Sequence, residues 1–214
     1  MDWAEFAAAL GVFLLSHAVP ARQPVKPWLV GLLGQRGFTV AYSLLSLAVL
    51  AWLIGAAGRA PFVMLWGWEP WHNHVVLAVM GAVCLILTLA IGRPNPFSFG
   101  GTNNAAFDPA RPGITGWMRH PLLAALALWA TAHAFANGTL AHVIMFGSFA
   151  GFALVGGRLI DRRRQRDMGA EWHRLRLTAQ RPGIGDTLLS DPLRLLAGVV
   201  LYAALILAHP LLFG

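Results

Sequence analysis

Six runs of apolar residues divide the chain at intervals that suit membrane-spanning helices. They cover about residues 3–20, 38–57, 75–92, 121–137, 139–156 and 193–213. A helix rises about 1.5 Å per residue, so roughly 20 apolar residues cross the hydrocarbon core of a bilayer. The fourth and fifth runs are separated only by Asn137-Gly138. This pair favours a tight turn, and we therefore expect an antiparallel helical hairpin there.

The composition supports the same interpretation. Of 214 residues, 57% are hydrophobic and only 12% are charged, and the mean hydropathy is +0.61. A soluble domain of this length could not bury so much apolar surface around one core, whereas lipid solvates the outward faces of a helix bundle. We predict an all-α fold: a polytopic membrane helix bundle of about six transmembrane helices, forming a single domain over residues 1–214.

The positive charges gather on one side of the predicted bundle. Of the 16 Lys and Arg, all but Arg59 lie in or beside the first, third and fifth loops. Because cytoplasmic loops carry an excess of Lys and Arg, we place these loops in the cytoplasm and both termini in the periplasm of a bacterial inner membrane. Topology and contact with anionic lipid then explain the net charge of +7, and we expect no nucleic-acid partner.

The fifth loop also carries a helical pattern. Ile160, Met168, Trp172 and Leu175 recur near helical spacing among arginines. Such a pattern is typical of an amphipathic helix lying in the membrane interface. We therefore predict a cytoplasmic interfacial helix in this loop, with a partner-binding or cofactor-binding surface as the alternative.

Four histidines in or beside the apolar runs are the candidates for chemistry. His17, His133 and His209 lie late in the first, fourth and sixth runs, and His120 immediately precedes the fourth. An ionisable group in a membrane span marks a functional hypothesis, and imidazole is a common axial ligand of haem iron. The alternative for each is a hydrogen-bonded structural histidine. Counted at about 1.5 Å per residue, depth pairs His133 with His209 on the outer side and His17 with His120 on the inner side.

Short motifs spread from the first run to the last resemble those of a known family. In chain order they are Ser16–Arg22 (SHAVPAR), Gly34–Gly37 (GQRG), Gly113-Ile114 ahead of Arg119-His120-Pro121, Leu128–His133 (LWATAH), Asp161-Arg162-Arg163 and Ala208–Leu211 (AHPL). Each motif is weak by itself. Their order and spacing together resemble the NnrU family of membrane proteins.

The resemblance implies a cofactor. The NnrU family is linked to denitrification, around nitric oxide and nitrite reduction, and is related to the 15-cis-zeta-carotene isomerase, a membrane enzyme that holds haem b. The resemblance implies haem b here, with His17 and His133 matching the isomerase's proposed iron-ligating histidines. His120 and His209 are the substitutes, and Arg119 and Arg22 are candidates for pairing with the haem propionates, their other role being to set topology.

The resemblance leaves the chemistry open. The haem would act on a small hydrophobic substrate, bind nitric oxide or pass an electron, so both isomerase-type and redox-type chemistry are compatible with it. The isomerase has a cysteine, proposed as an alternative ligand, three residues before its second histidine. This chain has Ala130 there. The resemblance therefore extends to the two histidines and not to that cysteine.

Two further functions compete with haem binding. Arg119-His120-Pro121, followed about fifty residues later by Gly169-Ala170-Glu171-Trp172, also resembles membrane methyltransferases of the isoprenylcysteine type. In those enzymes the two segments enclose S-adenosylmethionine at the cytoplasmic face. The last alternative is a non-catalytic membrane factor that helps to mature or regulate a nitrogen-oxide reductase. The sequence sets no oligomeric state.

Overall fold

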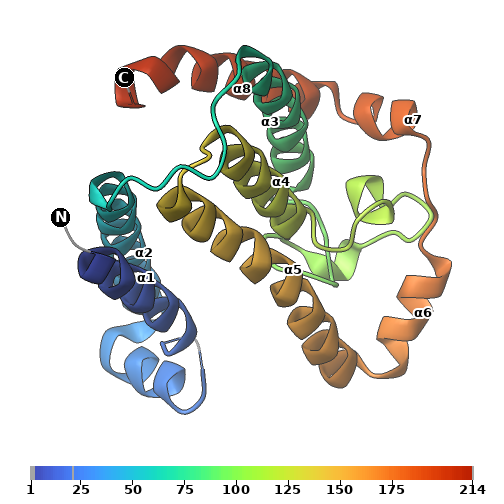
Figure 1. Cartoon of the computed structure of the whole chain (residues 1–214). Coiled ribbons are helices and arrows are strands. Elements are labelled where there is room, and N and C mark those ends of the chain that lie inside the picture. Colours follow the sequence, from blue (N-terminus) through green and yellow to red (C-terminus); the bar gives the residue numbers. More distant parts are fainter. Residues whose placement is uncertain (1–2, 21, 214) are drawn as a thin grey trace. The chain divides into compact units, whose positions relative to one another are not determined.

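The computed structural model describes residues 3–20 and 22–213 and forms them mainly into helices (Figure 1). Within these residues the only β pairing is an isolated bridge between Met64 and Thr139. The all-α prediction is confirmed, and Ala21 of the His17 motif lies outside the described residues. The helices are α1 (Trp3–Ala18), α2 (Val25–Arg59), α3 (Pro70–Ala90), η1 (Asn104–Ala106), η2 (Gly113–Gly116), α4 (Pro121–Ala136), α5 (Leu140–Met168), α6 (Ala170–Thr178), α7 (Ile184–Leu189) and α8 (Pro192–Phe213).

Among the described residues, four helices are long and apolar enough to cross a membrane. They are α2, α3, α5 and the Pro192–Leu211 part of α8. Helices α1 and α4 correspond to the other two predicted spans, and each has 16 residues, or about 24 Å of helical rise. The described part of the chain is therefore that of a helical membrane protein, with four candidate membrane-spanning helices and two shorter apolar helices.

The chain forms two compact units. Unit 1 consists of Met1–Gly67 and Asn137–Met145, and unit 2 of Trp68–Ala136 and Phe146–Gly214. In unit 1, α1 packs against α2, and Arg59 of α2 forms an ion pair with Glu5 of α1 at 2.5 Å. The one cation outside the predicted basic loops is thus paired with an acid. The single domain stays a prediction.

Helix α2 begins 13 residues before the apolar run that predicted it. The predicted loop 21–37 is therefore helical from Val25 onward, and α2 is broken at Gly34, where φ is 70° and ψ is 165°. Glycine alone adopts this conformation readily because it has no Cβ. A break in a helix, rather than a loop, separates the first part of α2, up to Gly34, from its long remainder.

Unit 2 contains the larger core. Helix α3 packs against α4 and also against α8 (Figure 1). Helices α4 and α5 run antiparallel, as predicted: Trp129 stacks on Phe149 at 6.0 Å between ring centroids, while at the other ends of the two helices His120 lies beside Asp161. The core is apolar and comes mainly from α3, with one buried residue each from η2 and α4; its buried members are Val83, Ile86, Leu89, Ala90, Ile114 and Ala125.

The residues of the predicted amphipathic pattern are divided between two helices: Ile160 and Met168 lie in α5, and Trp172 and Leu175 lie in α6. Helix α5 continues to Met168, and α6 starts after Gly169, whose φ of 57° breaks the helix. Trp172 and Leu175 of α6 are buried together with Phe97. The apolar face of α6 therefore packs against the chain's own loop, while its arginines stay exposed.

Candidate functional site

His133 lies in the last turn of α4, and its ring has a defined orientation. Its Nδ1 is 2.8 Å from the carbonyl oxygen of Trp129. A carbonyl can only accept, so Nδ1 carries the proton and Nε2 carries the lone pair. The ring also contacts the rings of Trp129 and Phe146, at centroid distances of 5.0 Å and 5.4 Å. This is the arrangement in which a metal-binding histidine is held by its second nitrogen.

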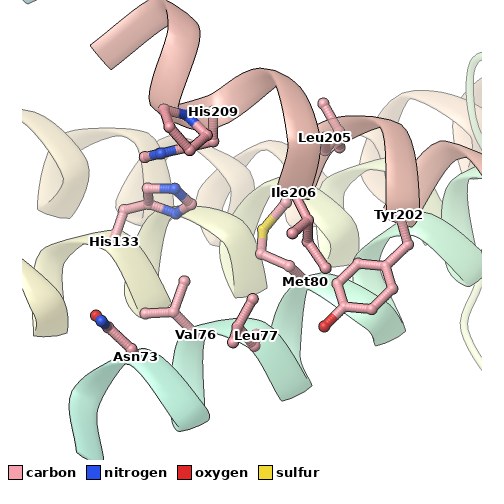
Figure 2. Close-up of a pocket in the computed structure, with 10 residues that line it drawn as sticks. Asn73, Val76, Leu77, Met80, His133, Tyr202, Leu205, Ile206 and His209 are labelled. Carbon is pink, nitrogen blue, oxygen red and sulfur yellow. The ribbon is translucent and has the colours of Figure 1, made fainter. Parts of the chain in front are cut away.

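His133 opens onto an apolar pocket that we call the histidine pocket. The pocket has a volume of about 310 Å³ and is open along one side. Figure 2 shows His133 on one side of it and His209 of α8 on another, with α3 side chains beneath them. Both imidazoles line this one pocket. The lining residues are Asn73, Val76, Leu77, Met80, His133, Tyr202, Leu205, Ile206, His209 and Pro210.

The packing of unit 2 explains why a pocket forms here. Helix α3 contacts both α4 and α8, so it forms a floor between them. Pro210 lies inside α8 and cannot donate the usual backbone hydrogen bond to the residue four positions earlier, Ile206. The structure thus brings together His133 and His209, the pair that depth along the helices predicts.

His17 belongs to unit 1 and shows the same local geometry as His133. Its Nδ1 is 2.8 Å from the carbonyl oxygen of Phe13, one turn earlier in α1, and the two rings lie 4.1 Å apart. Its Nε2 therefore carries the lone pair, as in His133. Arg22 follows in the exposed turn between α1 and α2. His17 and His133 lie in different units, so their pairing on one iron stays a prediction.

His120 and Arg119 belong to a polar cluster at the start of α4. His120 places Nδ1 3.0 Å from Ser98 Oγ and Nε2 3.1 Å from Asp161 Oδ1. Arg119 donates to both oxygens of Asp161, at 2.7 Å and 3.3 Å. Both ring nitrogens of His120 are thus hydrogen-bonded, and His120 could bind a metal only by giving up one of these bonds.

Burial governs the protonation of His120. Loss of hydration lowers the pKa of His120 below its usual value, and this effect exceeds the opposite pull of the Asp161 carboxylate. The neutral ring then donates Nε2–H to Asp161 and accepts the Ser98 hydroxyl proton at Nδ1. Arg119 lies 14 positions before His133 on the chain, about 21 Å along a helix, and is therefore remote from the histidine pocket.

The two segments that resemble those of a methyltransferase both contact the dipeptide Phe97-Ser98. His120 contacts Ser98, and Trp172 packs edge-on against Phe97 at 6.4 Å between ring centroids. Their charged groups, however, are paired within the chain. Arg119 binds Asp161, and Glu171 binds Arg174 at 2.6 Å.

Sequence reasoning gave no role to several residues that shape these sites. Trp129 and Asp161 were both parts of family motifs, but their contacts with His133 and His120 depend on how α4 lies against α5. For Asp161, the position of an acid among arginines could have indicated an ion pair. No sequence signal pointed to Ser98, because its partner His120 lies 22 residues away in the chain.

The histidine pocket and the apolar helices define a helical membrane protein with two imidazoles converging on an apolar cavity. The chain belongs to the NnrU family: the family model described as NnrU protein matches residues 5–214. Neither a curated protein nor a solved structure matches the chain significantly.

Proposed function

We propose that this protein is a haem b protein of the bacterial inner membrane, with both termini periplasmic, that works in nitrogen-oxide metabolism. The observation that carries the proposal is the position of His133. Its Nδ1 is held by the Trp129 carbonyl, while the ring lines an apolar pocket next to a second imidazole. The family's link to denitrification supports the metabolic part.

The donor set fits haem better than a metal ion held by the protein alone. Among the described residues, no three His, Cys, Asp or Glu side chains are grouped to hold a metal. Haem iron takes four ligands from its porphyrin and needs only one or two imidazoles from the protein. The lining between the two histidines is apolar except for Asn73 and Tyr202, which suits a hydrophobic macrocycle.

The size of the pocket bears on how a haem would sit. A volume of about 310 Å³ lies at the low end of ligand pockets, which range over about 300–1,000 Å³. Because the pocket is open along one side, a larger ligand can extend out of it. A haem would therefore be held partly by protein and partly by lipid.

The protein's own residues would set the position and electronic properties of the haem. His133 would supply the proximal nitrogen, and the Trp129 carbonyl would fix its tautomer. Either His209, from the pocket, or His17, from the family resemblance, would be the second ligand. When bound, haem would supply an iron that binds nitric oxide, transfers an electron or polarises an alkene.

An absorbance spectrum of the full chain, purified in detergent, tests the proposal. We expect a Soret band that shifts on addition of dithionite. His133→Gly should abolish most of the haem, and added imidazole should restore the band by filling the vacated ligand position. A colourless protein that binds S-adenosylmethionine would favour the methyltransferase, and a colourless protein that does not would favour the accessory factor.

Two further variants identify the second ligand. Loss of haem or conversion to a high-spin spectrum in His209→Ala, with an unchanged spectrum in His17→Ala, assigns His209, and the reverse assigns His17. His74→Ala is the matched control, since His74 is an exposed α3 residue next to the pocket residue Asn73 and does not line the pocket. A normal spectrum in all of the histidine variants would refute the pocket as the haem site.

A further inference from the structure

A second cavity in unit 2, which we call the α3–α7 groove, lies further along α3 than the histidine pocket. Its volume is about 200 Å³, and it is open on one side. Thr187 offers the groove a hydroxyl, but the exposed surface of the lining is almost wholly apolar. The lining residues are Ala82, Leu85, Ile86, Leu89, Ile114, Trp117, Met118, Ile184, Thr187 and Leu188.

The walls of the groove are held in place by polar contacts at its edge. Trp117 Nε1 donates to Thr187 Oγ1 at 3.2 Å, which fastens α7 beside η2. The Thr187 hydroxyl in turn donates to the Gly183 carbonyl at 2.9 Å. The single hydroxyl of the lining is thus occupied, and the groove offers water few partners. An apolar occupant suits it better than solvent.

Cations stand beside this apolar groove. The Arg181 guanidinium lies over the Trp117 ring, 4.0 Å from its centroid, and Arg181 is exposed. Among the described residues no carboxylate lies within ion-pair distance of Arg181, whereas Arg93 and Arg194 share Asp191 at 2.9 Å and 3.2 Å.

The residues near the groove therefore include three arginines (Arg93, Arg181 and Arg194) and two acids, Asp186 of α7 and Asp191. Arg194 is also fixed to the end of α3, because its Nη1 donates to the carbonyls of Thr88 and Ile91 at 2.8 Å and 2.6 Å. Arg181, which lies over the lining residue Trp117 and forms no ion pair among the described residues, is therefore the cation best placed to bind a further anion.

We propose that the α3–α7 groove binds one acyl chain of an anionic phospholipid, whose phosphate pairs with Arg181. An acyl chain matches the apolar lining, and the negative headgroup complements the excess of arginine at its edge. The groove is smaller than most small-molecule pockets, which favours a segment of chain over a compact ligand. This end of α3 is also the side that the count of arginines predicts to be cytoplasmic, where the surface potential of the membrane is negative. The site is independent of haem.

Native mass spectrometry of the full chain in detergent tests this proposal, with dioleoyl phosphatidylglycerol and dioleoyl phosphatidylcholine as probes. We expect one phosphatidylglycerol to be retained under conditions that remove phosphatidylcholine. Ala82→Phe should abolish this retention by filling the groove. Ala78→Phe is the matched control, because Ala78 is exposed one turn earlier on α3 and does not line the groove.

The charge is tested separately. Arg181→Gln should lower the preference for phosphatidylglycerol over phosphatidylcholine about fivefold, while Arg166→Gln, an exposed arginine of α5, should leave it unchanged. Because Arg181 is an exposed side chain, this variant keeps the test valid if Ala82→Phe does not fold. Equal retention of the two lipids by the unsubstituted protein, or equal retention of phosphatidylglycerol by the two phenylalanine variants, would overturn the proposal.

Discussion

The imidazole of His133 donates a hydrogen bond to the carbonyl oxygen of Trp129, one helical turn earlier, over 2.8 Å. The indole ring of Trp129 also packs against this imidazole, with 5.0 Å between the ring centroids. Trp129 therefore fixes the tautomer of His133 through its backbone and the ring plane through its side chain. The two effects separate experimentally, because every residue type has a backbone carbonyl, so a substitution at Trp129 that preserves the helix keeps this acceptor.

Removing the Trp129 ring should weaken haem binding without abolishing it. We expect Trp129→Ala to lower the haem affinity of the apoprotein about tenfold, since groups that orient a metal ligand contribute at this level. Trp129→Phe keeps an aromatic face and should lose less. Titration of the apoprotein with haem measures the effect. Leu128→Ala, on an exposed neighbour, is the control, and an equal loss in that variant would contradict a specific role for Trp129.

Asp161 should contribute to stability through Arg119 and His120. Asp161→Asn leaves the Arg119 guanidinium without its charged partner, and the pair is partly exposed, at 38% for Arg119 and 22% for Asp161. We expect a loss of about 1–2 kcal/mol in the free energy of unfolding, between the values for surface and buried pairs. Chemical denaturation in detergent, followed by circular dichroism, measures it.

Asp167→Asn is the control for Asp161→Asn on the same helix. Asp167 pairs with Arg163 at 3.6 Å, and both side chains are more than half exposed. Such surface pairs contribute little, so we expect a change below about 0.5 kcal/mol. Equal losses in the two variants would show that the cluster around His120 adds no more stability than an ordinary surface pair.

The fold could be predicted from the sequence to the extent that it depends on local hydrophobicity. The length of the apolar runs predicted the membrane helices, and Asn137-Gly138 predicted the hairpin of α4 and α5. The start of α2 was wrong because a segment that contains prolines, glycines and basic residues resembles a loop. The helix continues through that segment, with a single break at Gly34.

The sequence could predict which residues of the site lie together only where their depth along the helices determines it. Counting residues paired His133 with His209, and both line one pocket. The partners of His120 depend instead on the crossing of α4, α5 and the loop at Ser98, which periodicity does not encode. For the same reason the Trp172 side chain, expected at a membrane surface, is buried against Phe97.

Acid should destabilise the cluster around His120. Burial lowers the pKa of folded His120, whereas the unfolded residue titrates near its usual value of 6.5. Between the two values the unfolded chain binds more protons, so the free energy of unfolding falls as the pH is lowered through about 6.5. We expect the melting temperature of the unsubstituted protein to fall more steeply between about pH 7.5 and pH 5 than that of His120→Gln.

The comparison with His120→Gln isolates this histidine from the seven others, which are present in both proteins. His173→Gln is the matched control, because His173 is exposed on α6. Its pH dependence should follow that of the unsubstituted protein. Parallel curves for the unsubstituted protein and His120→Gln would mean that His120 binds protons equally in the folded and unfolded states.

The break in α2 supplies the last prediction. Gly34 has a φ of 70° and a ψ of 165°, a region that is costly for any residue with a Cβ. Gly34→Ala should therefore destabilise unit 1 by about 1–3 kcal/mol, although a methyl group there would meet no atom within 4 Å. Gly31→Ala adds the same methyl group to open space at a position where φ is not positive. It should be neutral or stabilising by up to about 1 kcal/mol, because alanine favours a helix. Chemical denaturation of both variants measures the difference in the free energy of unfolding. Because space for a methyl group is available at both sites, only the backbone conformation distinguishes them. Equal stabilities of the two variants would mean that α2 runs unbroken through Gly34.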